Sequence, residues 1–158
     1  MKDYTPLFEQ VVATYTPLIY RHCLVMLGTP SDAEDAVQET FLRYLQKAPR
    51  FRDEAHEKAW LLTVAMNLCR NQLRYRKAHP HIDTDHYPEP WAQTEDTPIL
   101  DAVAALPDGV KAVVLLHYVE GYKVREIAAR LRMSQSAVKM RLQKGRQLLK
   151  DYLKEEDV

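Results

Sequence analysis

This sequence has no long apolar run and no closely spaced cysteines. No stretch approaches the ~18–20 consecutive apolar residues that a membrane-spanning helix needs, and the N-terminal MKDYTPLFEQ has no apolar signal-peptide core. Cys23 and Cys69 form no CxxC motif, so we interpret both as reduced packing residues, with a redox pair as the less favoured alternative. We therefore expect a cytoplasmic protein that does not insert into membranes.

Motifs of catalysis are also missing. The chain has only four glycines and no Gly-rich phosphate-binding loop, and its Ser, His and Asp residues follow no catalytic spacing. One cluster of potential metal ligands lies in a proline-rich stretch, and its spacing matches no metal site: His79, His81, Asp83, Asp85 and His86. We therefore expect no metal, no cofactor and no reaction catalysed by this chain alone.

Charge is balanced overall but segregated along the chain. The 22 Lys and Arg residues equal the 22 Asp and Glu residues, yet the stretch from Pro80 to Asp101 holds six acidic residues and no basic one. Four prolines in the same stretch disfavour helix and strand, whereas the flanking regions show helical spacing. The sequence thus predicts an all-α protein with two small helical domains, residues 1–79 and 98–158, joined by a flexible linker over 80–97.

The first of these domains shows helical spacing throughout. We predict a helix that is interrupted near Pro17 and resumes until Gly28. A second helix should begin at Ser31, with Glu34 in the capping-box position, and a long helix should cover residues 57–77. The same spacing predicts these buried side chains on the last two helices: Ala36, Val37, Thr40, Phe41, Tyr44, Leu45, Trp60, Leu61, Val64, Ala65, Leu68 and Leu73.

The stretch from Glu120 to Leu149 contains the most specific pattern in the chain. Apolar residues recur at helical spacing on both sides of Met133, and Ser134 is suited to cap the second helix. In a helix-turn-helix, the second helix lies in the DNA major groove. Nine Lys and Arg residues from 123 to 150 are opposed by one acid, Glu126, which suits phosphate contacts. A solvated helical hairpin is the alternative.

The end of the long helix carries a second candidate nucleic-acid surface. Asn67, Asn71 and Arg74 share one face at helical spacing, and Tyr75 offers a ring for stacking. Arg70, Arg76 and Lys77 add charge with no acid nearby. The alternative is a solvated helix end, where cations suit the helix dipole.

The helix that begins near Ser31 is acidic in its first two turns: Asp32, Glu34, Asp35, Gln38 and Glu39. Negative charge near an N-terminus stabilises any helix. The functional alternative is a docking face for a protein, because the two candidate DNA-binding segments leave this face to another partner.

Together these residues resemble the small extracytoplasmic-function group of bacterial RNA polymerase sigma factors, over nearly the whole chain. Residues 32–42, DAEDAVQETFL, are similar to that family's region 2.2, and residues 60–68, WLLTVAMNL, to its regions 2.3 and 2.4. Glu126-Ile-Ala and the segment SAVKMRL from Ser136 are similar to region 4.2. The resemblance implies sigma region 2 in the first domain and sigma region 4 in the second.

The resemblance further implies a transcription initiation factor whose partners are core RNA polymerase, promoter DNA and an anti-sigma protein. The residues that would dock on polymerase are Asp32, Asp35, Gln38 and Glu39. The residues that would bind and melt the −10 element are Phe51, which would help to capture a flipped base, and Asn67, Arg70, Asn71 and Arg74. The residues that would bind the −35 duplex are Gln135, Ser136, Lys139, Met140, Arg141 and Lys144, with Arg141 on phosphate.

Three positions depart from the family pattern, and a second function remains as an alternative to that of a sigma factor. Lys123 stands where the family has Ser or Thr, so the preceding cap lacks a side-chain acceptor. Arg132 stands where Gly is frequent, at a position of positive φ, and Met66 replaces a common Arg. The alternative function is a two-domain helix-turn-helix regulator that binds an operator on its own as a dimer.

Overall fold

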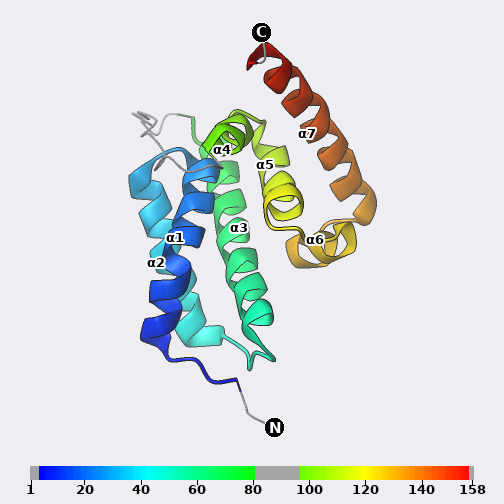
Figure 1. The fold of residues 1–158 in the computed structure, drawn as a ribbon. Helices are drawn as coiled ribbons and strands as arrows, with labels where there is room; N and C mark the ends of the chain where they lie inside the picture. The colour runs from blue at the N-terminus through cyan, green and yellow to red at the C-terminus, as the bar shows by residue number, and fades with distance from the viewer. Residues whose placement is uncertain (1–3, 81–96, 157–158) are drawn as a thin grey trace. The chain divides into compact units, whose positions relative to one another are not determined.

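The computed structural model describes residues 4–80 and 97–156 (Figure 1). The chain divides into two compact units, Met1–Tyr87 and Pro88–Val158, here called the N-terminal and the C-terminal unit. The described residues form helices and contain no strand, which confirms the predicted all-α class. The predicted linker lies almost wholly outside the described residues, so its bounds and those of the two domains stay a prediction.

The N-terminal unit consists of α1 (Phe8–Leu27), α2 (Pro30–Lys47) and α3 (Glu54–Ala78), which pack against one another (Figure 1). The predicted interruption of the first helix is wrong, because α1 runs through Pro17 without a break. Pro17 is exposed, and the helix is held on its other side by a buried row that includes Val11, Tyr15 and Ile19. This packing outweighs the roughly 3 kcal/mol that an interior proline costs a helix.

The turn between α1 and α2 is shorter than predicted. Gly28 has φ 82° and its N–H donates to Leu24, which ends α1. Pro30, whose fixed φ suits the first helical position, then starts α2 with Thr29 as N-cap. The capping box predicted from Ser31 is therefore wrong, because Ser31 already lies inside the helix.

The buried face of α2 contains Ala33, Val37, Thr40 and Phe41. Leu45 was predicted to be buried but its side chain is 62% exposed, because the stripe continues from Phe41 to the half-buried Tyr44 instead.

The long helix α3 begins three residues before its predicted start. The Asp53 carboxylate accepts the His56 N–H at 2.8 Å and caps the helix. Its buried side chains are centred on a different row from the predicted one, since Trp60, Val64 and Leu68 are only half-buried. The buried residues are Glu57, Ala59, Leu61, Leu62, Ala65, Met66, Cys69 and Leu73.

Both cysteines are free and fully buried, Cys23 in α1 and Cys69 in α3. A hydrogen bond with Cys69, together with burial, raises the pKa of the Cys23 thiol well above its ordinary value. Cys23 thus packs as a neutral thiol beside the buried Cys69, in agreement with the packing interpretation.

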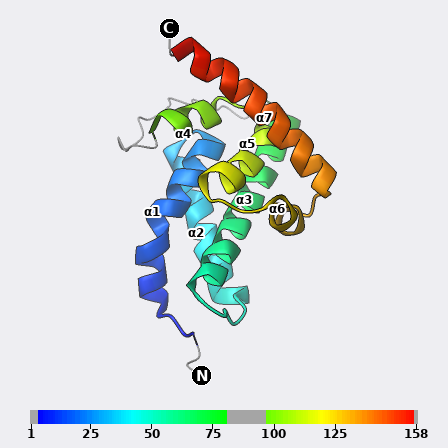
Figure 2. The same ribbon diagram turned by 45° about the vertical axis from the view of Figure 1, so that its right-hand side comes forward.

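The C-terminal unit contains α4 (Thr97–Ala104), α5 (Asp108–Val114), a π-helical turn η1 (Leu115–Val119), α6 (Val124–Leu131) and α7 (Gln135–Glu156). Helix α7 contacts α4, α5 and α6, and its course along α5 is visible from two sides (Figures 1 and 2). The two helices approach closely at Gly145, where a Cβ atom would lie 2.6 Å from Val114 Cγ2 and 3.1 Å from Val110 Cγ1. Only glycine lets the two helices approach this closely.

Candidate nucleic-acid and polymerase interfaces

The turn between α6 and α7 has the local structure that the sequence predicts. Arg132 adopts the left-handed conformation, with φ 56° and ψ 48°, and its N–H caps α6 by donating to Ala128. For a residue with a Cβ this conformation costs roughly 1–2 kcal/mol. Ser134 Oγ accepts the Ala137 N–H at 3.0 Å and caps α7. The turn of the helix-turn-helix is therefore defined by a left-handed backbone residue at the end of α6 and by a side-chain cap at the start of α7.

The start of α6 is capped from one direction only. The Glu126 carboxylate accepts the Lys123 N–H at 3.1 Å. A lysine ammonium has no acceptor to offer in return, so the side-chain cap that the sequence predicted to be missing is indeed missing.

The first three turns of α7 separate into a buried and an exposed face. Val138 and Leu142 are buried against the rest of the C-terminal unit, and Ile127, Ala128 and Leu131 of α6 line the same core. Five of the predicted −35 residues lie on the exposed face: Gln135, Ser136, Lys139, Met140 and Lys144. Met140, the apolar member of this set, is 70% exposed.

Arg141, the sixth predicted −35 residue, is half-buried and has a partner inside the unit. Its Nη1 donates to the Gly109 carbonyl at 2.9 Å and joins α7 to the first turn of α5. Arg146 similarly donates at 2.9 Å to the hydroxyl of Tyr118, a residue of the π-helical turn η1. These two arginines attach the helix to its support, and the remaining exposed cations surround it: Lys123, Arg125, Arg132, Lys139, Lys144 and Lys150.

The four predicted −10 residues of α3 are brought together as two bonded pairs. Arg70 donates to Asn67 Oδ1 at 3.0 Å, and Arg74 donates to Asn71 Oδ1 at 2.6 Å. In this amide orientation the exposed Asn71 directs its oxygen to Arg74, so that its NH₂ group is the part that could donate to a base edge. Asn71 and Arg74 are exposed, whereas Asn67 and Arg70 are half-buried.

The fifth predicted −10 residue, Phe51, has little exposed surface. Its side chain is 7% exposed, stacks on Tyr44 at a centroid distance of 5.8 Å, and meets Trp60 and His56 edge-on. The predicted role in base capture stays a prediction, and in this conformation the ring supports the loop between α2 and α3 from inside.

A buried carboxylate beneath this aromatic cluster was missed by the sequence analysis. Glu57 is 1% exposed and accepts hydrogen bonds from the Tyr4 and Tyr44 hydroxyls at 2.8 and 2.7 Å. Burial, together with the carboxylate, raises the pKa of both tyrosines far above their ordinary value. An acid in the first turn of a helix looks solvated in sequence, and nothing local indicates that two distant tyrosines cover it.

The acidic face of α2 also contains exposed apolar side chains. Asp35 and Gln38 are exposed, and Glu39 forms a partly exposed ion pair with Arg43 at 3.3 Å. Leu42 and Leu45, 47% and 62% exposed, continue this face along the helix. The sequence analysis missed both as part of this face, although Leu42 follows Asp35 and Leu45 follows Gln38 by seven residues, or about two helical turns.

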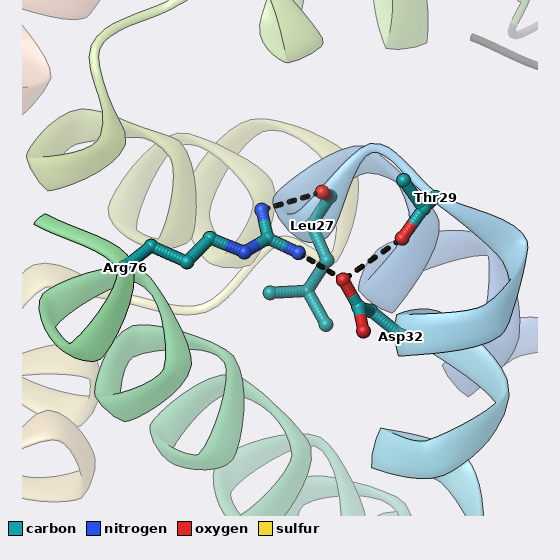
Figure 3. Close-up of polar contacts among 4 residues, drawn as sticks. All are labelled: Leu27, Thr29, Asp32 and Arg76. Atoms are coloured by element: carbon teal, nitrogen blue, oxygen red, sulfur yellow. Dashed lines mark hydrogen bonds and ion pairs between the residues drawn. The ribbon is translucent and has the colours of Figure 1, made fainter. Parts of the chain in front are cut away.

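Asp32, the remaining predicted docking residue, is engaged within the chain (Figure 3). Its Oδ2 accepts a hydrogen bond from Arg76 Nη2 at 2.5 Å and one from Thr29 Oγ1 at 2.9 Å. Arg76 also donates through Nη1 to the Leu27 carbonyl at 2.8 Å. The last turn of α3 is thus tied to the end of α1 and the start of α2.

A metal centre has no support in the described part of the chain, where no three His, Cys, Asp or Glu side chains gather as potential ligands. His79 stacks on Tyr75 at 4.1 Å, and the other potential ligands in the sequence lie outside the described residues. Among the helices described, none is long and apolar enough to cross a membrane.

Sequence comparison identifies relatives for both units. The family model Sigma-70 region 2 matches residues 11–79, and Sigma-70, region 4 matches residues 97–149. The ECF RNA polymerase sigma factor SigL of Mycobacterium tuberculosis is 33% identical over 81% of this chain and 78% of its own length. SigW of Bacillus subtilis is 28% identical over 94% and 89%. SigE of Mycolicibacterium smegmatis is 30% identical over 94% of this chain, which spans 62% of SigE.

Solved structures share the fold. The sigma factor RpoE from Bartonella quintana, in complex with the anti-sigma factor NepR, matches with a TM-score of 0.70 at 21% identity over 93% of this chain and 96% of RpoE. The extracytoplasmic-function sigma factor SigJ of Mycobacterium tuberculosis matches with a TM-score of 0.66 at 21% identity, over 89% of this chain and 52% of SigJ. The two family models and the relatives at 30% identity or more together show that this chain belongs to the extracytoplasmic-function group of RNA polymerase sigma factors, which direct transcription from specific promoters and are not enzymes.

Proposed function

We propose that this sigma factor recognises the −35 element as duplex DNA through α7 and captures the −10 element through α3, while α2 docks on core RNA polymerase. The observation that carries the proposal is the exposed face of α7. Polar and cationic side chains gather on this face, opposite the side of the helix that is buried in the unit. The helix follows directly on the turn that Ser134 caps. A helix presented in this way can enter a major groove, where Gln and Ser can bond to base edges and Lys to phosphate or guanine.

The proposed −10 contacts rest on the paired side chains of α3. Asn71 offers an amide donor, and Arg74 holds that amide in place through its oxygen. Asn67 and Arg70 form a second bonded pair on the same helix. A flipped base costs a few kcal/mol of unstacking. Hydrogen bonds from the Asn71 amide, together with phosphate contacts from the exposed Arg74, would offset that cost.

The proposed polymerase contact combines charge with apolar area. Asp35, Gln38 and Glu39 lie on the same exposed face of α2 as Leu42 and Leu45. Exposed leucines that lie together with charged groups are typical of a surface that a partner covers. The partner would present cations opposite the acids and an apolar patch opposite the leucines.

An anti-sigma protein is the proposed inhibitor. RpoE was solved with the anti-sigma factor NepR, and CnrH, with a TM-score of 0.62 at 24% identity, with the cytosolic domain of CnrY. For this chain the supporting observation is again the leucine-bearing face of α2, which a competing partner could cover. This role places the protein in the cytoplasm with its polymerase.

The test is a binding and transcription experiment with purified components. The full chain is incubated with bacterial core RNA polymerase, and run-off transcription is then measured on a library of genomic fragments. Binding together with new, discrete start sites is expected, and Asp35→Arg should abolish the binding while the fold survives. If the chain ignores polymerase and retains operator-like DNA on its own as a dimer, the regulator function replaces this one.

A further inference from the structure

The contacts of Asp32 differ from those of the other acids on α2. Its Oδ2 accepts two hydrogen bonds from within the chain, one of them from a guanidinium, and its side chain is 31% exposed. Asp35, one helical turn further on, is exposed. A carboxylate that is already neutralised by Arg76 gains less from a cation of a partner protein than an exposed carboxylate does.

The contacts of Arg76 are equally distinctive. Its side chain is 18% exposed, and its two Nη atoms are directed to two different helices (Figure 3). Through Nη1 it bonds the carbonyl of Leu27 in the last turn of α1, where carbonyls lack partners within their own helix. Through Nη2 it holds Asp32 in the first turn of α2. A planar guanidinium can make both bonds at once, and a lysine ammonium would not fit this geometry as well.

The position of Arg76 in α3 connects these bonds to the proposed DNA surface. Arg76 lies two residues after Arg74, in the last turn of a 25-residue helix. Helix ends fray when they are not anchored, and fraying here would disturb the Arg74–Asn71 bond and the orientation of both side chains. Holding the last turn against the α1–α2 turn keeps that face in one conformation.

We propose that Asp32 and Arg76 are a positioning pair, which fixes the DNA-facing end of α3, and that Asp32 is not a polymerase-docking residue. This inference rests on the proposed function of α3 and changes the predicted role of Asp32. Removing either member should impair promoter opening and leave polymerase binding intact.

The experiment is a double-mutant cycle with Asp32→Ala, Arg76→Ala and the double variant, each in the full chain. Affinity for bacterial core RNA polymerase is measured by fluorescence anisotropy. Promoter opening is measured by permanganate reactivity of unpaired thymines, on the strongest fragment selected by run-off transcription. Each single variant should open promoter roughly tenfold less, the order of effect of one charge-assisted hydrogen bond. Polymerase affinity should stay within about twofold.

The double variant should be no worse than either single variant, because side chains that act as a unit are non-additive. Promoter opening with Arg76→Lys should lie between that of the unmodified chain and that of Arg76→Ala. Lysine keeps the positive charge but lacks the planar guanidinium that bonds to Leu27 and Asp32 at once. Ser31→Ala, an exposed position in the same turn of α2 with no proposed contact, is the matched control and should change neither readout. Thermal unfolding followed by circular dichroism identifies any variant that fails to fold.

The outcomes separate this inference from the proposed function. If the unmodified chain binds polymerase and opens promoter, but Asp32→Ala weakens polymerase binding as Asp35→Arg does, only the positioning role is overturned. Additive effects of the two single variants would also overturn it. If the unmodified chain neither binds polymerase nor opens promoter, the proposed function fails and the positioning role fails with it.

Discussion

The second half of α3 and the first half of α7 both carry arginines beside small polar side chains, but these arginines have different partners. In α3, Arg70 and Arg74 bond to the asparagines of their own helix. In α7, Arg141 bonds to the Gly109 carbonyl at the start of α5, and the remaining predicted contact residues lie exposed. The α7 face is therefore attached to the rest of its unit on one side and exposed on the other, whereas the α3 side chains are bonded to one another within the face that is proposed to bind DNA.

This difference matches the two forms of DNA that the helices are proposed to bind. A duplex presents base edges at fixed positions, so a rigid face already in place loses little entropy on binding. A melted strand has no fixed geometry. Side chains that are hydrogen-bonded to one another keep the binding site ordered while no base is bound. We expect changes in α7 to affect affinity, and changes in α3 to affect opening.

The largest expected effect comes from Gly145→Ala, which tests whether α7 is rigidly attached. The new methyl would lie 2.6 Å from Val114 Cγ2, and overpacking of this kind costs about 1–3 kcal/mol. Urea unfolding followed by circular dichroism should show the loss, and −35 binding should fall with it. Gly109→Ala is the control, because its methyl would lie 3.8 Å from Arg141 Nη1, an ordinary contact. Equal stability of the two variants would show that the close helix contact is not limiting.

The next effect tests whether the two helices act at different steps. Lys139→Ala should weaken promoter binding by the polymerase complex roughly fivefold, about 1 kcal/mol. It should also reduce the slope of log affinity against log salt concentration by about one. Arg74→Ala should leave binding to a −35 duplex unchanged and reduce promoter opening. Gel-shift titrations at several salt concentrations measure the first effect, and permanganate reactivity measures the second. If both variants weaken duplex binding alike, the contrast between α3 and α7 is wrong.

A smaller effect concerns the buried Glu57, which supports the loop before α3. The pKa of Tyr4 is raised in the folded chain, so its hydrogen bond contributes stability that is present below its ordinary pKa of 10.0 and is lost as pH rises beyond it. Tyr4→Phe should lower stability at neutral pH by about 0.5–1 kcal/mol. It should also show a smaller further loss between pH 9 and 11 than the unmodified chain does. Parallel urea titrations at both pH values check this, and parallel losses in the two proteins would contradict it.

The smallest effect should be a gain. Arg132→Gly removes a Cβ from a left-handed residue in the helix-turn-helix turn and so relieves its backbone strain. The greater conformational freedom of glycine in the unfolded chain offsets part of that gain in stability. We expect about 0.5 kcal/mol of added stability, visible as a higher midpoint in thermal unfolding. A loss of stability would show that the Arg132 side chain contributes contacts that exceed its backbone strain.

Features that depend on neighbouring residues in sequence were predictable, and features that depend on distant ones were not. The Ser134 cap and the left-handed Arg132 follow from a few adjacent residues, and the structure has both. The continuity of α1 through Pro17 depends on packing against two other helices. The exposure of Leu45 does so as well, because the position of the buried stripe is set by where the helices cross.

The candidate site follows the same division. The exposed face of α7 could be predicted because helical periodicity alone separates it from the seam. The burial of Phe51 and Glu57 depends on Tyr44, and in the case of Glu57 also on Tyr4, which is 53 residues away in sequence. The internal bonds of Asp32 and Arg141 span 44 and 32 residues, so no local pattern could separate them from neighbours of the same charge.

The close approach at Gly145, near the middle of α7, makes this residue the pivot about which the helix would tilt against α5. At 1.5 Å per residue, Gln135 lies about 15 Å from that pivot. A tilt of about 4° at the pivot would therefore move the first turn of the helix by about 1 Å, a large fraction of a hydrogen-bond length. The lack of a Cβ at Gly145 thus determines the direction in which the first turn of α7 points toward DNA, nearly three helical turns away.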